Sequence, residues 1–426
     1  MKKVKEGYKM TEIGEIPSEW KVKKLGEITI GKGEYGIGAS ATEYIEGKPR
    51  YLRITDIGDS CRLLFNDIKG LDDADYEKYI LKEGDIVFAR TGNTTGKGYV
   101  YNREHGELVY AGFLIKYSID NNIAKHNFIK YVIQSKRYWD WVNIMSTRSG
   151  QPGINSNEYS SFIVQLPPLK EQEKIASILS TVDEQIDNVD ALIEKNKELK
   201  KGLMQTLLTK GIGHTKFKKT EIGEIPEEWE VSNLTNIVDI KGRVGWKGYT
   251  KKDLVEFGPL AIGAMHINSN NKLDLSEPVY LSKKKYEESP EIMVSKDDII
   301  LAQRGSLGKV VLIEKEIGEA TINPSMVLIK NIKINSRYLY YFLCSEYIQK
   351  VIFKETSQTS IPMISQEQIG KFKIIIPTIK EQEKIASILS EVDKKIEEYE
   401  NKKQKLEKLK KGLMQQLLTG MIRVTV

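Results

Sequence analysis

The sequence predicts an α+β protein with two mixed α/β globular domains and a long antiparallel two-helix coiled coil, related by internal duplication and a pseudo-two-fold axis. The segment KEQEKIASILS occurs identically at residues 170–180 and 380–390. TEIGEIPSEW at residues 11–20 returns as TEIGEIPEEW at residues 220–229, and KGLMQTLLT from Lys201 returns as KGLMQQLLT from Lys411. The chain is therefore one unit of about 210 residues, repeated once.

Each copy of KEQEKIASILS opens an amphipathic run whose apolar residues step alternately by four and three, the spacing of a coiled-coil seam. A single such run also fits a solvated helix with an apolar stripe, but two matched seams favour mutual pairing. Asn196 and Lys403 fall on the seam, a pattern that fixes register. The seam residues are Ile175, Leu179, Val182, Ile186, Val189 and Ile193, then Ile385, Leu389, Val392, Ile396, Tyr399, Leu406, Leu413 and Leu417.

The helix ends are predicted from capping signals. Thr378 and Glu381 have the spacing of a capping box at the start of the second helix. Gly211 and Gly420 are suitable stops for the first and second helices. We therefore expect rods of about 39 residues, or roughly 58 Å at 1.5 Å per residue.

The repeats divide the chain in the order domain, helix, domain, helix. Because the termini of a domain often lie close together, the second helix should start where the first stops, which makes the pair antiparallel with a domain at each end. The expected segments are globular domain 1 at 1–166, helix 1 at 167–211, a linker plus globular domain 2 at 212–376, helix 2 at 377–420 and a tail at 421–426.

Each globular domain repeats one skeleton. An apolar strand runs into a glycine-rich polar loop at 81–97 and again at 294–309. A second strand follows from Leu108 or Ser325, and then an aromatic-rich helical stretch from Asn127 or Arg337. A polar loop and a last strand, FIVQLP or FKIIIP, lead into the long helix.

Composition describes an ordinary soluble chain of 426 residues with a mildly basic net charge of +6. This charge permits a polyanionic partner without requiring one. The two cysteines offer no disulfide framework or zinc spacing. With no signal peptide and no apolar run of 18 residues, we expect a cytoplasmic protein with no membrane contact.

Motifs for catalysis are weak or incomplete. Gly31, Gly33 and Gly36 satisfy G-x-G-x-x-G, but no helical pattern follows and the sister stretch lacks the motif. The GNTTGKG stretch from Gly92 has the wrong spacing for a phosphate-binding loop. A nuclease or methyltransferase would need a nucleophile, base or metal set that the sequence does not offer. We expect a non-catalytic binding protein without a cofactor of its own.

Polar and basic loop residues are the candidates for DNA contact, because Arg, Asn and Gln pair with base edges while Lys, Ser and Thr hold phosphates. They occupy equivalent loops of both domains, but the residue types differ between the domains. Recognition of an asymmetric two-part site requires such a difference. The first domain contributes Lys32, Arg90, Thr91, Asn93, Thr94, Lys97, Arg148, Ser149 and Gln151; the second contributes Lys241, Arg243, Trp246, Lys247, Gln303, Arg304, Ser306, Lys309, Ser357, Gln358 and Thr359.

Taken together, the TEIGEIP-x-EW segments, the PPLKEQEKIASIL and PTIKEQEKIASIL helix starts and the KGLMQ-x-LLT ends resemble the specificity (S) subunit of type I restriction-modification systems. The resemblance covers essentially the full chain. It implies a DNA reader in which each domain recognises half of a bipartite site and the helices set the gap, associated with the nucleoid through DNA. It also implies two modification subunits that bring S-adenosylmethionine, and restriction subunits that bring ATP and Mg.

Docking of the modification subunits is expected at the helix ends. Gly202 and Gly412 lie inside otherwise helical runs, where glycine costs about 1 kcal/mol relative to alanine. Their retention is explained either by a tolerated kink or by close approach of a partner. The candidate docking residues are Gly202, Leu203, Met204, Gly412, Leu413 and Met414. The competing hypothesis is a two-headed protein-interaction scaffold with a coiled-coil spacer, whose contact with duplex DNA would not depend on salt.

Overall fold

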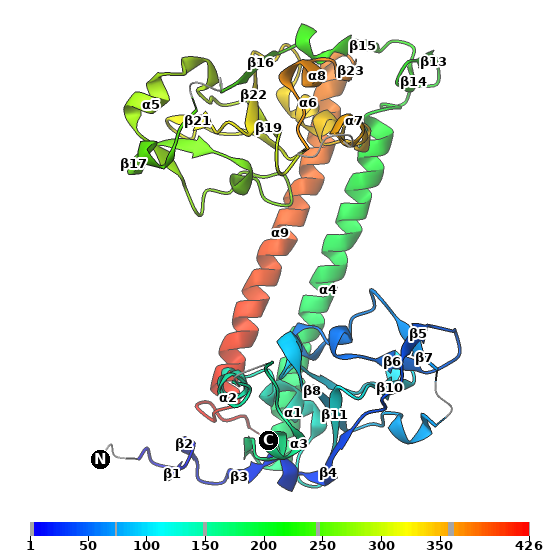
Figure 1. The fold of residues 1–426 in the computed structure, drawn as a ribbon, viewed down its shortest axis with the longest axis vertical. Coiled ribbons are helices and arrows are strands. Elements are labelled where there is room, and N and C mark those ends of the chain that lie inside the picture. Colours follow the sequence, from blue (N-terminus) through cyan, green and yellow to red (C-terminus); the bar gives the residue numbers. More distant parts are fainter. Residues whose placement is uncertain (1–3, 73–74, 148–150, 244–247, 357–361, 426) are drawn as a thin grey trace. The chain divides into compact units, whose positions relative to one another are not determined.

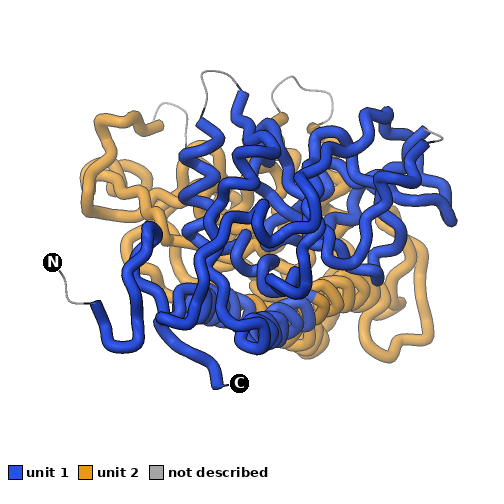
Figure 2. Tube along the Cα trace, turned by 90° about the horizontal axis from the view of Figure 1, so that it is seen from below, with its two compact units in different colours: residues 1–190, 401–426 blue, residues 191–400 orange. Residues whose placement is uncertain are grey.

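The computed structural model describes the whole chain except residues 1–3, 73–74, 148–150, 244–247, 357–361 and 426. The chain forms two compact units, coloured separately in Figure 2. Unit 1 comprises residues 1–190 and 401–426, and unit 2 comprises residues 191–400. Each unit therefore contains one globular domain together with parts of both long helices.

The two long helices are α4 (Leu169–Leu207) and α9 (Ile379–Leu417), each of 39 residues, which is the expected length. Each is followed by a turn containing a glycine in the left-handed region, Gly211 at φ +68° and Gly420 at φ +71°. Glycine suits these turns because side chains with a Cβ rarely adopt positive φ.

The helices pair in antiparallel fashion within each unit (Figure 1). In unit 1, Lys403 Nζ lies 2.6 Å from Asp190 and Lys410 Nζ 2.7 Å from Asp183, so residue numbers rise along one helix as they fall along the other. In unit 2, Lys200 Nζ lies 2.7 Å from Asp393, which continues the same register. The antiparallel coiled coil is thus confirmed, with these seam positions buried: Ile175, Leu179, Val182, Ile186, Val189, Ile193, Ile385, Leu389, Val392, Ile396 and Leu417.

Unit 1 is organised around an antiparallel sheet of order β4-β11-β8-β9. Its strands are β4 (Thr29–Tyr35), β11 (Leu114–Ile119), β8 (Asp85–Ala89) and β9 (Gly98–Val100). The smaller pairs are β1 (Tyr8–Thr11) with β2 (Gly14–Pro17), β3 (Lys21–Lys24) with β12 (Ile163–Leu166), β5 (Ala41–Glu43) with β7 (Lys69–Leu71), and the parallel pair β6 (Arg50–Leu52) with β10 (Leu108–Tyr110).

The helices of unit 1 join this sheet to α4 through one apolar core. Phe88 of β8 packs its ring against Tyr159, with centroids 4.8 Å apart, and the same core includes Ile175 of α4. The predicted aromatic-rich helical stretch forms two helices, and Ser135 caps the second by accepting a hydrogen bond from the Tyr138 N–H. The helices are α1 (His126–Val132), α2 (Lys136–Met145) and α3 (Ser156–Ser160).

Unit 2 repeats this plan with a sheet of order β16-β22-β19-β20, which confirms the internal duplication. Its strands are β13 (Phe217–Thr220), β14 (Gly223–Pro226), β15 (Glu230–Asn233), β16 (Asp239–Gly242), β17 (Leu254–Ile262), β18 (Tyr280–Leu281), β19 (Ile299–Ala302), β20 (Val310–Leu312), β21 (Ala320–Ile322), β22 (Met326–Lys330) and β23 (Lys373–Ile376). Its helices are α5 (Lys283–Glu287), α6 (Ser336–Leu343), α7 (Glu346–Thr356) and α8 (Gln366–Gly370).

The repeated tryptophan and the repeated KEQEK glutamate contact each other in both units. Trp20 Nε1 donates to Glu171 at 3.1 Å, and Trp229 Nε1 donates to Glu381 at 2.9 Å. The capping box predicted from Glu381 is wrong, because both carboxylate oxygens of Glu381 accept hydrogen bonds from outside the helix start, including the ring of His214 at 2.9 and 3.1 Å.

The following glutamine of each KEQEK segment ties the long helix to the domain's own helices. Gln172 accepts from the Lys125 N–H at 2.8 Å and donates to Pro167 O at 2.8 Å. Gln382 does the same with the Asn335 N–H at 2.9 Å and Pro377 O at 2.8 Å. The identical glutamines of the two segments therefore make the same buried hydrogen bonds in both units.

The glycine motif of residues 31–36 lies in and directly after strand β4, where the glycines allow close packing. Gly31 and Gly33 lie within β4, which pairs with β11 and leads into no helix. A Cβ on Gly33 would meet the Tyr117 ring at 2.4 Å, and one on Gly36 would meet Ala111 O at 2.3 Å. Only glycine permits this close approach.

We predict that Glu171→Ala lowers the stability of the chain by about 2–3 kcal/mol, because the buried Trp20 N–H and the Arg423 guanidinium lose their acceptor. Urea unfolding followed by tryptophan fluorescence measures this loss. The matched control is Glu173→Ala, an exposed carboxylate two residues along the same helix, which should shift stability by less than about 0.5 kcal/mol. Equal midpoints for the two variants would contradict the anchoring role.

Candidate nucleic-acid interface

The candidate interface is built on the loop that follows the central strand of each sheet. In unit 1 this loop runs from Arg90 to Lys97 between β8 and β9, and in unit 2 from Gln303 to Lys309 between β19 and β20. Backbone bonds close both loops in the same way: Ala89 N–H donates to Lys97 O at 2.8 Å, and Ala302 N–H to Lys309 O at 2.9 Å. The predicted correspondence of the two loops is therefore visible in the backbone.

Arg90 is half-buried at the start of the first loop and is held by a hydrogen bond to the backbone and by aromatic contacts. Its Nε donates to Gly112 O at 3.3 Å. Its guanidinium carbon lies 5.1 Å from the Tyr35 ring centroid and 5.8 Å from that of Phe113, within range for cation–π attraction. Tyr35 and Phe113 are themselves 44% and 56% exposed, so both rings are accessible to solvent beside Arg90.

Tyr35 and Phe113 were not among the predicted site residues. Phe113 lies between β10 and β11, because the single strand predicted from Leu108 is divided into two strands in the structure. An exposed aromatic residue at the end of a strand is of the same residue type as one in the core. The alternation of apolar and polar residues therefore did not distinguish exposed rings from buried ones. Gly112, directly before it, is the one sequence signal of a break.

The remaining described candidates fall into two groups. Some present their side chains to solvent: Lys32, Asn93, Gln151, Lys241, Arg304 and Ser306. Others are half-buried in the loop framework: Thr91, Thr94, Lys97, Gln303 and Lys309. Seven predicted residues lie outside the described parts of the chain: Arg148, Ser149, Trp246, Lys247, Ser357, Gln358 and Thr359.

Lys97 and Lys309 are both engaged by the segment after the parallel strand of their own domain. Lys97 Nζ pairs with Asp59 at 2.9 Å, whereas Lys309 Nζ donates to Ile267 O at 2.6 Å. These contacts hold each loop against its domain. The lysines consequently reach a phosphate only by giving up an internal partner.

Arg243 differs from the expectation of a surface contact. It is only 6% exposed, its Nε donates to Ile322 O at 3.3 Å, and its Nη2 donates to Thr321 Oγ1 at 3.0 Å. Burial lowers the pKa of this guanidinium from its usual value. Arg243 therefore stabilises unit 2 from within and is not exposed on its surface.

The candidate docking residues are half exposed. Gly202 and Gly412 are solvent-facing helical positions where an added Cβ would meet nothing within 4 Å. Leu203 and Met204 pack partly against the core of unit 2, and Leu413 and Met414 partly against that of unit 1. No contact inside the described chain thus accounts for either glycine.

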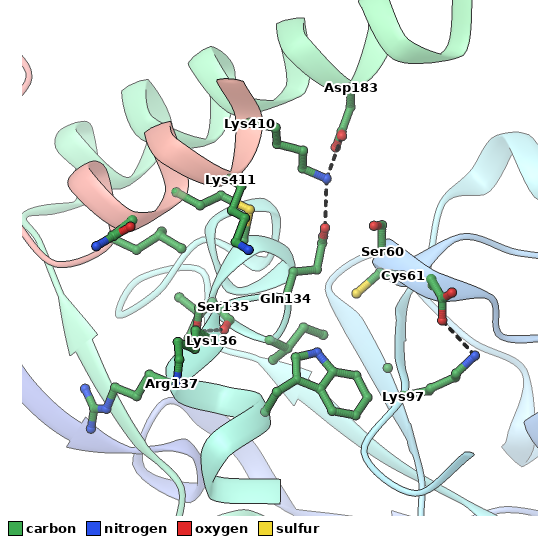
Figure 3. A pocket seen from close by; sticks show the side chains of 18 of the residues that line it. Ser60, Cys61, Lys97, Gln134, Ser135, Lys136, Arg137, Asp183, Lys410 and Lys411 are labelled. Carbon is green, nitrogen blue, oxygen red and sulfur yellow. Dashed lines mark hydrogen bonds and ion pairs between the residues drawn. The ribbon is translucent and has the colours of Figure 1, made fainter. Parts of the chain in front are cut away.

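Beside Met414, unit 1 contains a cavity of about 1150 Å³ between α2 and the long helices (Figure 3). Lys410 crosses it to Asp183 at 2.7 Å and to Gln134 Oε1 at 2.9 Å. Burial raises the pKa of the Cys61 thiol on its wall to about 12. At the corresponding place in unit 2, Gln205 Nε2 bonds Glu346 at 2.8 Å across the helices.

Two further classes of site are not seen in the parts of the chain that the structure describes. Those residues contain no cluster of His, Cys, Asp and Glu arranged to hold a metal ion. They also contain no helix that is both long and apolar enough to cross a membrane.

Comparison with known proteins gives a consistent result. A family model described as the type I restriction modification DNA specificity domain matches the chain twice, at residues 17–200 and 226–408. The type I restriction enzyme MjaVIII specificity subunit of Methanocaldococcus jannaschii is 30% identical over 96% of this chain and 94% of its own length. The EcoBI specificity subunit of Escherichia coli is 24% identical over 54% of this chain and 52% of its own length.

Solved structures support the same fold. The S subunit of a type I restriction-modification system from M. genitalium is similar with a TM-score of 0.61 at 16% identity, covering 96% of this chain and 97% of that one. A chain from a type I R-M system studied for complex assembly and conformational transition has a TM-score of 0.55, also at 16% identity, and covers 96% of this chain and 99% of that chain.

Proposed function

The chain belongs to the type I restriction-modification DNA specificity family, and on that premise we propose that its two domains each read one half of a bipartite, asymmetric DNA site. Its homologues are specificity subunits, which lack catalytic activity themselves. The coiled coil of α4 and α9 sets the gap between the half-sites and docks the modification subunits. This chain recognises the DNA sequence, and its partner subunits catalyse the reactions.

The observation that supports this proposal is that the equivalent loops of the two domains have the same backbone hydrogen bonds but different polar side chains. Arg90 stands where the second domain has Gln303, and Thr91 stands where it has Arg304. Base edges in the major groove are distinguished by just such differences in donors and acceptors. Two domains with the same frame and different contact residues would select two unlike half-sites.

The partners follow from the family. Two modification subunits would supply S-adenosylmethionine, and restriction subunits would supply ATP and Mg in the full complex. The partner-facing surface is the solvent side of the helix ends around Gly202 and Gly412, where nothing in the described chain fills the space. The complex would act in the cytoplasm, at the nucleoid through its DNA.

We predict salt-dependent and sequence-selective binding for the chain purified with its modification subunits. Selection from random double-stranded DNA should return two fixed half-sites separated by a gap of fixed length. Affinity should fall linearly on a log–log plot against salt, because each neutralised phosphate releases counterions. Salt-independent binding without any enriched sequence would instead favour the protein-interaction scaffold.

We predict that inserting one heptad into each long helix lengthens the gap and leaves both half-sites unchanged. Insertion directly after Asp190 in α4 and directly before Lys403 in α9 keeps the paired register, since these two residues face each other at 2.6 Å. Seven residues add about 10 Å, or roughly three base pairs.

The same binding-site selection measures this change. A heptad inserted into α4 alone is the control, because it breaks the register and should abolish folding or binding. Altered half-site letters in the double insertion would refute the spacer role.

We predict that Gly202→Gln and Gly412→Gln weaken copurification of the modification subunits while the chain itself folds normally. Glutamine meets open space at these positions and favours helix more than glycine does, so stability should rise by about 0.5–1 kcal/mol. Lys408→Gln, at another exposed position of α9, is the matched control. Asp substitutions at Leu203, Met204, Leu413 or Met414 should also block docking, although these side chains contribute to the cores. Undiminished copurification with the glutamine variants would reject this docking surface.

A further inference from the structure

Arg90 and Gln303 occupy the same place in the two domains by every backbone criterion. The Arg90 N–H donates to Phe113 O at 3.1 Å, and the Gln303 N–H donates to Ser325 O at 2.9 Å. Arg90 O accepts from the Ile154 N–H at 2.9 Å, and Gln303 O accepts from the Ile364 N–H at 3.0 Å. Each residue directly follows the central strand of its sheet, β8 or β19.

Their side chains are also tethered in the same way. Arg90 Nε donates to Gly112 O at 3.3 Å, and Gln303 Nε2 donates to Pro324 O at 3.1 Å. In both domains this carbonyl belongs to the residue just before the one that accepts the main-chain bond. One intramolecular bond therefore restrains each side chain before any ligand arrives, which reduces the entropy cost of binding.

The tether leaves a different hydrogen-bonding pattern on each side chain. Within the described residues, the two terminal nitrogens of Arg90 have no hydrogen-bond partner, so two NH2 groups remain available as donors. Gln303 keeps its Oε1 acceptor and the second hydrogen of Nε2, again with no partner in the described part of the chain. Two donors match the O6 and N7 acceptors of guanine, and one donor with one acceptor matches N7 and N6 of adenine.

The surroundings of Arg90 strengthen its assignment to a base rather than a phosphate. Tyr35 and Phe113 flank its guanidinium at 5.1 and 5.8 Å, and both rings are substantially exposed. Apolar rings beside a planar donor group suit the stacked edges of bases more than the hydrated sugar-phosphate backbone. Flexible lysines at the surface lack this restraint.

We infer that Arg90 and Gln303 are paired specificity determinants, Arg90 reading a guanine in the half-site of the first domain and Gln303 an adenine in that of the second. This inference rests on the proposed function, and it adds which residue reads a base and which base it reads. The two domains thus have different residues at one equivalent structural position. Exchanging arginine and glutamine at this position should exchange guanine and adenine in the recognised half-sites.

The test is binding-site selection from random double-stranded DNA by the full chain with its modification subunits. Arg90→Gln should change one position of the first half-site from G to A, and Gln303→Arg should change one position of the second from A to G. At each position the original base should lose at least about tenfold in relative affinity. Every other position should keep its preference.

The control is Arg103→Gln, the same substitution at an exposed arginine of the first domain that pairs with Glu83. It should leave both half-sites unchanged. If Arg90→Gln and Gln303→Arg weaken all sequences equally, the two residues contact phosphates and the inference is wrong, although the proposed function stands. If the chain without substitutions selects no bipartite DNA sequence, the proposed function itself is wrong.

Discussion

The buried contact between a repeated tryptophan and a repeated glutamate determines how each domain meets its long helix. Trp20 and Trp229 are fully buried, and an indole N–H removed from water needs an acceptor. Glu171 and Glu381 supply it from the first turn of α4 and of α9. Arg423 and His214, each in the segment after a long helix, then bind the same carboxylates. A single glutamate therefore joins the start of one helix to the segment that follows the other.

This anchor explains why the helix starts are identical while the domains diverge. Glu171, Gln172 and their counterparts hold fixed backbone and side-chain partners, so a change in any of them leaves a buried polar group unpaired. The side chains at the tips of the loops after β8 and β19 are not constrained by such buried hydrogen bonds. Their backbones are fixed by the sheet, and their exposed side chains are free to differ. The loop residues can therefore differ between the two domains without loss of the frame.

The two units are alike in strand order but not in every local contact. The long-helix lysines keep their partners, since Lys410 binds Asp183 in unit 1 and Lys200 binds Asp393 in unit 2. Beside them, unit 1 has a large cavity where Gln205 and Glu346 bridge the helices of unit 2. Equivalent charge pairs between the long helices are thus present in both units, whereas the contacts beside them differ.

The sequence by itself determined the duplication, the length of both helices and the residues of their seam, because repeats and a four-three spacing are local, one-dimensional signals. It also located the two loops that follow the central strands. Only the tertiary structure decided which loop residues are available. Arg243 turned out to be buried, Lys97 and Lys309 to be tied to their own domains, and Phe113 to be exposed beside Arg90. Exposure and hydrogen-bond partners depend on which distant segments fold over a residue, and no spacing within the chain records that.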